Sequence, residues 1–253
     1  MLTAADLMTA YPVCIEATES PSTAAGLLRR HGFRHLPVTG TFGVLSGMVS
    51  DARIESAPDG TETVAAIEDP VEAVLLRDTP ISVALTRLMA ARQGVAVIVD
   101  DAERPVGILT ESDLVRTAVA LLPEDEEVAE LPSRRVFAIQ RVEPARNAMA
   151  LMEEHGIRHV LVLDGNRLDG VLSWRDLEAR GVLDGFDLRA ADILGNQSVC
   201  FTTRRAPLVA VARMMSRQRI GCVPVLDGPD AVGVYTRIDV VEALRSRLAL
   251  TGG

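Results

Sequence analysis

Three short stretches of the sequence place a hydroxyl side chain three residues before an aspartate. These pairs are Thr110 with Asp113, Ser173 with Asp176, and Thr236 with Asp239. A hydroxyl at the residue before a helix can cap it, and an acid three positions later points back toward the same helix end. Each pair is therefore predicted to present a hydroxyl and a carboxylate at one helix start. There they either accept hydrogen bonds from a ligand or only cap the helix and favour its dipole.

The stretches that carry these pairs are copies of one motif. The copies read GMVSDARI from residue 47, GILTESDL from 107, GVLSWRDL from 170 and GVYTRIDV from 233. Their hydroxyls lie 60, 63 and 63 residues apart. Because four copies recur at nearly constant spacing, we predict four units of one repeated fold.

Each unit is predicted to fold as strand, helix, strand, strand and helix. A short strand candidate opens the unit, from residues 13, 73, 136 and 199, and a helix with apolar residues at spacings of three and four follows it. This order predicts a parallel strand pair with a crossover helix, and a tight turn then adds an antiparallel neighbour. A three-stranded sheet with one helix-covered face is too small to close its own core, so we expect the units to pack in pairs.

The predicted fold class is therefore α/β (α+β), with tandem β-α-β-β-α repeats paired into two modules. The acidic stretch at residues 121–133 is the clearest composition shift and falls at the middle of the chain. The predicted boundaries are 1–57 for repeat 1, 62–121 for repeat 2, 122–130 for an acidic linker, 131–183 for repeat 3 and 186–250 for repeat 4.

The paired units and their closing motif resemble the cystathionine β-synthase (CBS) domain, whose pairs are called Bateman modules. The resemblance covers essentially the whole chain. It implies binding of adenosine-containing ligands, commonly AMP, ADP, ATP or S-adenosylmethionine, in clefts between paired units, with no other cofactor required. A carboxylate is a good acceptor for both hydroxyls of a ribose, and each such bond contributes about 1.5–3 kcal/mol. The ribose candidates are Thr110, Asp113, Ser173, Asp176, Thr236 and Asp239.

A second block before each motif alternates between basic and small residues. The odd units carry Arg34 with His35 and Arg158 with His159, and the even units carry Val95 with Ala96 and Gly221 with Cys222. In the gamma subunit of the AMP-activated kinase, which the chain resembles only at this level, basic residues at matching positions contact nucleotide phosphates. Arginine also fits a phosphate bidentately. We therefore expect phosphate contacts from Arg34, His35, Arg158 and His159; the alternative is charges at strand edges that face solvent or pair with acids.

The first copy of the motif has lost its acid. Arg53 stands three residues after Ser50, and Asp51 cannot substitute because two residues along a helix rotate a side chain by roughly 200°. We expect the site of repeat 1 to be vacant. The alternative is that Arg53 contacts a phosphate of a ligand held mainly by repeat 2.

The histidines invite a second interpretation. The chain's four are His31, His35, His155 and His159, two pairs whose spacing would suit a metal ion if each pair lay on one helix. Gly32 and Gly156 lie inside the pairs, where the helix should end and the strand begin. The two rings of a pair need not share a face, so we expect no metal site.

Composition excludes several other functions. All 26 basic residues are arginine, so a P-loop lysine and a lysine Schiff base are absent. With a net charge of −9 and 3% aromatic residues, neither general attraction to nucleic acid nor a stacking platform for single strands is indicated. Three cysteines without a CxxC pair indicate core filling rather than disulfides or zinc. No apolar run reaches the length of a membrane span and the first residues lack signal-peptide features, so we expect no membrane association and a cytoplasmic protein.

No catalytic motif emerges, so we expect no enzyme. The favoured hypothesis is a stand-alone regulator that binds an adenosine-containing ligand and transmits its occupancy to an unknown protein partner. One alternative is an oligomerisation or interaction scaffold of the same fold with no bound nucleotide, and another is a cation sensor built on the histidine pairs. Module pairing is either intramolecular or between the copies of a homodimer. Trp174, at a predicted helix start, either stacks on an adenine or lies at a surface or interface.

Overall fold

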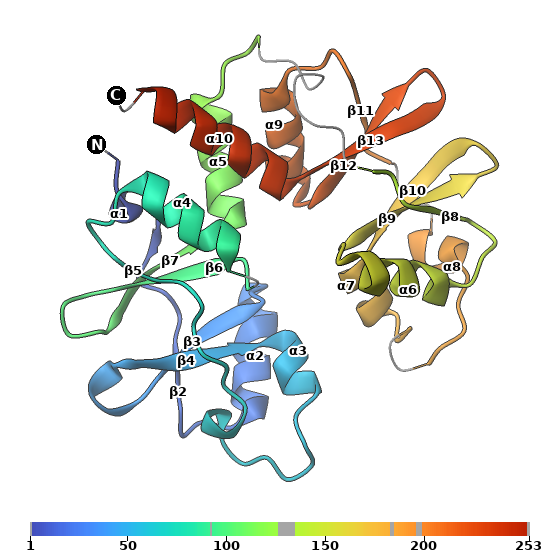
Figure 1. Cartoon of the computed structure of the whole chain (residues 1–253). Helices are drawn as coiled ribbons and strands as arrows, with labels where there is room; N and C mark the ends of the chain where they lie inside the picture. The colour runs from blue at the N-terminus through green and yellow to red at the C-terminus, as the bar shows by residue number, and fades with distance from the viewer. Residues whose placement is uncertain (1, 92, 126–134, 183–184, 196–198, 252–253) are drawn as a thin grey trace. The chain divides into compact units, whose positions relative to one another are not determined.

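The computed structural model describes residues 2–91, 93–125, 135–182, 185–195 and 199–251 (Figure 1). The chain forms two compact units. Unit 1 contains the described residues of Met1–Thr117 and Leu244–Gly253, and unit 2 contains those of Ala118–Ala243. Unit 1 contains repeat 1 and most of repeat 2, and unit 2 contains repeat 3 and most of repeat 4. Of the predicted acidic linker, 122–130, only residues up to 125 lie within the described part.

Each repeat has the predicted order of elements. Repeat 1 comprises β2 Ile15–Glu16, α2 Pro21–His31, β3 His35–Thr39, β4 Leu45–Ser50 and α3 Asp51–Glu55. Repeat 2 comprises β5 Val74–Leu76, α4 Ile81–Ala90, β6 Val95–Val99, β7 Pro105–Thr110 and α5 Glu111–Leu121. Repeat 3 comprises β8 Ala138–Gln140, α6 Ala145–His155, β9 His159–Asp164, β10 Arg167–Ser173 and α7 Trp174–Ala179. Repeat 4 comprises β11 Thr202–Thr203, α9 Leu208–Gln218, β12 Cys222–Asp227, β13 Asp230–Thr236 and α10 Arg237–Thr251.

The sheets have the predicted mixed topology, and the α/β class is confirmed. In every repeat the first strand runs parallel to the second, and the second runs antiparallel to the third. The crossover helix of repeat 1, α2, and the closing helix α3 lie together beside the sheet β2-β3-β4 (Figure 1). Helix α2 ends at Gly32 and α6 at Gly156, both left-handed, so the predicted helix ends are confirmed.

A proline in the central strand decides how long the first strand can be. In repeats 2 and 3 the amides of Val97 and Leu161 donate to the first strand, each over 2.9 Å. Repeats 1 and 4 carry Pro37 and Pro224 at the same position in the antiparallel register, and proline has no N–H to donate. Strands β2 and β11 accordingly have two residues, whereas β5 and β8 have three. The strand predicted from residue 199 is present but begins only at Thr202, because Phe201 falls opposite Pro224.

The central strands are buried on both faces, which explains why repeats pack in pairs. All five residues of β6 are buried, a pattern typical of a strand covered on both sides. One face of β6 packs with Met48 of repeat 1 in a cluster formed by Met48, Val95, Val97 and Val99. Repeats 1 and 2 therefore share a core.

Repeats 1, 2 and 3 each also receive a segment from the chain that leads into the partner repeat. We call these the crossing segments: residues 4–9, 64–69 and 190–195. They contain α1 Ala4–Leu7 and the start of β1 Thr9–Ala10, the 3-10 turn η2 Val64–Ala66, and α8 Ala190–Leu194. Their first residues donate to Thr79 O over 2.8 Å, Glu19 O over 2.7 Å and Glu143 O over 3.0 Å, respectively. Segment 4–9 thus docks on repeat 2, 64–69 on repeat 1 and 190–195 on repeat 3.

The crossing segments complete the cores that they reach. Val64 and Ile67 belong to the core of repeat 1, and Ala190 and Ile193 to that of repeat 3. These side chains are almost fully buried, so repeats 1 and 3 depend on these segments for part of their apolar burial.

The glycine that opens the motif of repeats 1, 2 and 3 is required where a crossing segment passes. A Cβ at Gly47 would lie 2.9 Å from the carbonyl oxygen of Asp69, and one at Gly170 would lie 2.6 Å from Leu194. Gly107 has Met8 in the same place. The glycine therefore provides the space for the segment rather than a special backbone angle.

Candidate functional site

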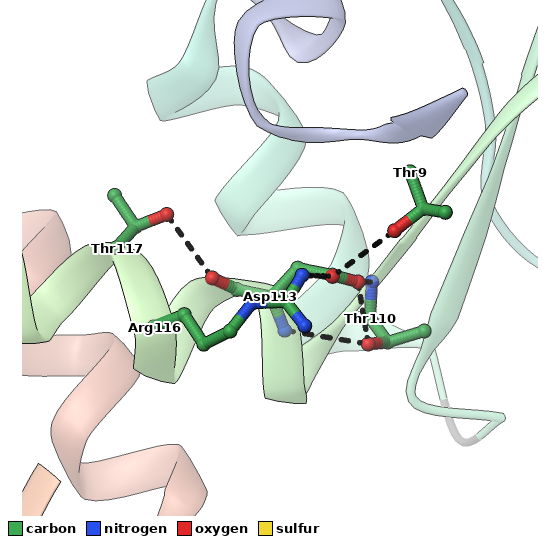
Figure 2. Close-up of polar contacts among 5 residues, drawn as sticks. All are labelled: Thr9, Thr110, Asp113, Arg116 and Thr117. Carbon is green, nitrogen blue, oxygen red and sulfur yellow. Dashed lines mark hydrogen bonds and ion pairs between the residues drawn. The ribbon is translucent and has the colours of Figure 1, made fainter. Parts of the chain in front are cut away.

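The start of α5 holds a predicted carboxylate, Asp113, with partners from two parts of the chain. Asp113 accepts hydrogen bonds from the Thr110 amide over 2.8 Å and the Thr110 hydroxyl over 2.6 Å. Its second oxygen accepts from the Thr9 hydroxyl over 3.4 Å and pairs with Arg116. Figure 2 shows Thr9 approaching from the crossing segment and Arg116 from the helix itself. Asp113 is only 6% exposed, whereas its partner Arg116 is 61% exposed, so a buried carboxylate is bonded here to partners that reach the surface.

The same contact occurs at two further helix starts. Asp176 accepts from the amide of Ser173 over 2.8 Å and from its hydroxyl over 2.6 Å. Asp239 accepts from the amide of Thr236 over 2.7 Å and from its hydroxyl over 2.6 Å. The structure therefore brings each predicted hydroxyl and acid together, and each acid caps its own helix.

The strand register places the second predicted block beside the helix starts. His35 pairs with Ser50 and His159 with Ser173 in the antiparallel ladders. In the even repeats Val95 pairs with Thr110 and Cys222 with Thr236. These histidines, a valine and a cysteine are thus equivalent cross-strand neighbours of the capping hydroxyl.

The register also corrects one alignment. The equivalents of Arg34 and His35 in repeat 2 are Gly94 and Val95, not Val95 and Ala96, because Val95 and His35 both lie opposite the capping hydroxyl. Glycine therefore stands at the arginine position in both even repeats, as Gly94 and Gly221. The prediction was displaced by one residue because the apolar run of β6 offers no internal marker of register.

The backbone of the arginine positions contacts the helix starts directly. The carbonyl of Arg34 accepts from the first amide of α3 over 3.2 Å, and that of Arg158 accepts from Trp174 over 3.0 Å. The Arg34 guanidinium is half-buried, and its Nε lies 3.9 Å from Asp51, an ion-pair distance without a hydrogen bond. The phosphate candidates are therefore next to the helix starts.

In unit 2 a histidine of repeat 3 reaches repeat 4. A Cβ at Gly221 would lie 2.9 Å from Nε2 of His159. The carbonyl of Gly221 in turn accepts from the first amide of α10, Arg237, over 3.3 Å. In unit 2 the large basic and the small residue are therefore sterically complementary, because His159 occupies the space that a side chain at position 221 would need. His159 consequently lies beside the helix start that carries Thr236 and Asp239.

Repeat 1 replaces the carboxylate with an ion pair. The Ser50 hydroxyl still accepts from the Arg53 amide over 3.1 Å, so the cap is intact. The Arg53 side chain turns to Asp69 of the crossing segment, with 3.3 Å between Nε and Oδ1. Arg53 is therefore already paired with an acid.

The histidine pairs divide between elements. His31 stacks on Phe33 with 5.1 Å between ring centroids, and His155 lies 4.2 Å from the ring of Phe137. Each is the last residue of its helix, whereas His35 and His159 begin strands. Within the described part of the chain, no group of three or more histidine, cysteine or acidic side chains gathers in a way that could hold a metal ion.

Burial also determines the chemistry of two cysteines. Cys222 is buried, and desolvation together with the nearby Asp239 carboxylate raises its pKa to about 12. Desolvation raises the pKa of Cys14 to about 11. Both thiols stay protonated near neutral pH, which disfavours nucleophilic roles. Trp174 is partly buried against the core of repeat 3.

Sequence reasoning missed Thr9 and Asp69. Each stands outside the repeat whose helix start it contacts, and Thr9 is 104 residues away from Asp113. Spacing within one repeat carries no signal for such a contact. The only usable signal was the motif glycine, whose missing side chain indicates close approach by another segment.

Four stretches of the chain match the CBS domain: residues 4–59, 64–120, 128–180 and 192–246. They cover most of its length, so the chain belongs to the CBS domain family. The predicted identity, four CBS repeats in two Bateman modules, is confirmed. The boundaries predicted from the sequence stay a prediction.

A protein from an archaeon is similar over nearly the whole chain. Protein MJ1404 of Methanocaldococcus jannaschii is 26% identical over 258 residues, which cover 94% of this chain and 60% of that relative. The chain thus spans about 60% of the length of that relative.

Two crystal structures share the fold. Protein MJ1225 of Methanocaldococcus jannaschii, described as a proposed archaeal homolog of g-AMPK, has a TM-score of 0.78 at 19% identity, covering 96% of this chain and 100% of that one. A conserved protein from Pyrococcus horikoshii has a TM-score of 0.73 at 22% identity, with the same coverage. Within the described residues, no helix is both long and apolar enough to cross a membrane.

Proposed function

We propose that this CBS-domain protein is a regulatory sensor that binds adenosine-containing ligands at the helix starts and transmits their occupancy to a partner. The ribose contacts are assigned to Asp113, Asp176 and Asp239 with their paired hydroxyls. The phosphate contacts are assigned to Arg34, His35, Arg158 and His159. The site of repeat 1 is vacant. No chemical step is assigned to the chain, and the proposed location is cytoplasmic.

The arrangement in unit 2 carries the proposal. His159 of repeat 3 lies against Gly221, at the start of the helix that bears Thr236 and Asp239. A group that can carry positive charge and a carboxylate thus come from two repeats to one place. A ligand with an anionic end and a hydroxyl-bearing end, such as a nucleotide, matches that pair of groups.

One observation favours a scaffold instead. Each carboxylate already accepts two hydrogen bonds from its own helix start. Capping alone is a sufficient structural reason for an acid at these positions. A scaffold of this kind would bind partners or copies of itself without a nucleotide. Titration with adenosine-containing ligands distinguishes the sensor from the scaffold.

Native mass spectrometry of the full chain, followed by calorimetric titration with AMP, ADP, ATP and S-adenosylmethionine, tests the proposal. We expect at least one of the four to bind at micromolar to millimolar concentration. If all four fail to bind at millimolar concentration, the sensor function is wrong and the scaffold remains.

Variants then assign the sites. Asp176→Ala and Asp239→Ala should each weaken binding at one site about tenfold or more, because a charge-assisted hydrogen bond is lost. Asp113→Asn is preferred at the buried site because it retains an oxygen for the cap. Asp101→Ala, at an exposed turn, is the matched control and should bind like the wild type.

A further inference from the structure

Two crossing segments place their last residue at the same point of two repeats. Asp69 pairs with Met48 in an antiparallel bridge, and Thr9 pairs with Ile108. Met48 and Ile108 each precede the capping hydroxyl by two residues. Asp69 therefore occupies the same structural position relative to repeat 1 as Thr9 does relative to repeat 2.

The polarity of the contact is reversed between these repeats. In repeat 2 the Thr9 hydroxyl donates to the Asp113 carboxylate over 3.4 Å. In repeat 1 the cation is on the helix and the acid on the crossing segment, with 3.3 Å between Arg53 Nε and Asp69 Oδ1. Either change alone would be unfavourable: an acid at both positions would repel, and Arg53 opposite a threonine would lose its charge partner.

We propose that Asp69 is the specificity-determining partner of Arg53, and that their ion pair latches the crossing segment over the first helix start in the place of a ligand. This rests on the proposed function and deepens it. The latch acts with the two backbone bonds between Met48 and Asp69, of 2.9 and 2.8 Å. Because the guanidinium is paired with Asp69, the phosphate contact considered for Arg53 is disfavoured. The first site excludes a nucleotide because an ion pair occupies it, and not only because the motif aspartate is missing.

Replacing both residues of the pair tests the ligand half of the proposal, which is that the Arg53–Asp69 ion pair keeps a nucleotide out of the first site. Arg53→Asp with Asp69→Thr recreates the polarity of Asp113 and Thr9. By native mass spectrometry with AMP, the double variant should bind one AMP more than the wild type. The matched control is Arg146→Asp with Asp187→Thr, which removes an exposed ion pair of the same residue types in unit 2 and should add none.

The single variants show whether the two residues act as a unit. Arg53→Asp alone places two carboxylates together, so its first site should bind AMP at least tenfold more weakly than that of the double variant. Asp69→Thr alone should gain no AMP. If the double variant keeps the wild-type circular dichroism and thermal transition but binds no additional AMP, the ligand half is overturned.

Hydrogen exchange tests the latch without any ligand. Both side chains are near half exposed, at 44% and 46%, so the pair should slow local opening only about two- to fivefold. In Arg53→Met the amides of Met48 and Asp69 should exchange faster by that factor at low salt, and the difference should shrink at high salt. The Val97 amide, bonded to Ala73, is the internal control.

The two failures are distinguishable. If the amide exchange rates of Met48 and Asp69 are unchanged in Arg53→Met, the latch is overturned, whether or not any variant binds AMP. If no AMP binds to the wild type or to the double variant, the proposed function and the ligand half fail together for AMP, and the exchange rates still decide the latch.

Discussion

Asp113 and Asp176 form the same capping contact in very different surroundings. Both accept from the amide and the hydroxyl three residues earlier, at nearly equal distances. Asp113 is buried and has Thr9 and Arg116 as further partners. Asp176 is exposed, and its hydrogen bonds described here come from Ser173.

The difference comes from residues outside the motif. Ala179 stands on α7 where Arg116 stands on α5, and Gly195 ends its crossing segment where Thr9 ends the other. The repeated motif therefore determines the cap, whereas residues outside it determine whether the carboxylate is buried and gains further partners. For a ligand, Asp176 is the more accessible acceptor and Asp113 the more rigidly held one.

The largest expected effect is a difference in the free energy of unfolding between variants that lack one or the other of these two acids. Asp113→Ala leaves the partly buried Thr110 amide and Arg116 without their acceptor and should lower the free energy of unfolding by about 2–3 kcal/mol. Asp176→Ala loses an exposed cap and should cost about 1 kcal/mol. Urea unfolding followed by far-UV circular dichroism measures both.

Two controls sharpen this measurement. Asp113→Asn keeps an acceptor for the cap and should recover part of the loss. Trp174 is the only tryptophan and lies in unit 2, so its fluorescence should report Asp176→Ala and not Asp113→Ala. Equal costs for the two alanine variants would contradict the distinction between a buried and an exposed cap.

A second prediction compares what the crossing segments bring to the motif glycines. Gly47→Ala meets a backbone carbonyl at 2.9 Å, whereas Gly170→Ala meets the end of the Leu194 side chain. A side chain can rotate away, but a backbone held by two hydrogen bonds cannot. Gly47→Ala should cost about 1–3 kcal/mol and Gly170→Ala less. The urea series measures both, and the reverse order would show that the segment on repeat 1 moves easily.

Much of the fold follows from local sequence signals. Spacing of the motif predicted four units, and the helix-ending glycines Gly32 and Gly156 predicted where strands begin. The short first strands were harder, because Pro224 sets the start of β11 from the neighbouring strand rather than from its own residues. The family match confirms the identity that the four motifs indicated.

The candidate site was predictable only within a repeat. The hydroxyl and acid pairs lie where the motif placed them. The contacts from Thr9 and Asp69 depend on a segment that crosses to the partner repeat, and no local spacing indicates such an exchange. The alternation of basic and small residues was visible in the sequence. Its steric reason, the fit of His159 against Gly221, became apparent only from the structure. Ligand contacts stay a prediction at all these residues.

A third and smaller effect compares the crossover helices. Gly26 in α2 occupies the position of Ala150 in α6, because both stand five residues before the closing histidine. A Cβ at Gly26 would meet nothing within 4 Å. Glycine inside a helix costs about 0.5–1 kcal/mol relative to alanine, so Gly26→Ala should stabilise unit 1 by that amount. A lower urea midpoint for this variant would mean that α2 needs the glycine for a reason other than space.

The smallest expected effect tests whether Thr9 belongs to the network of Asp113. Thr9→Val keeps the shape of the side chain and removes one long hydrogen bond of 3.4 Å, so it should cost about 0.5 kcal/mol. In the Asp113→Ala background the acceptor is already gone, and the same change should cost close to nothing. A double-mutant cycle by urea unfolding gives the coupling. Equal costs in both backgrounds would mean that Thr9 acts through packing of the crossing segment, and the contrast between Asp113 and Asp176 would then rest on Arg116 alone.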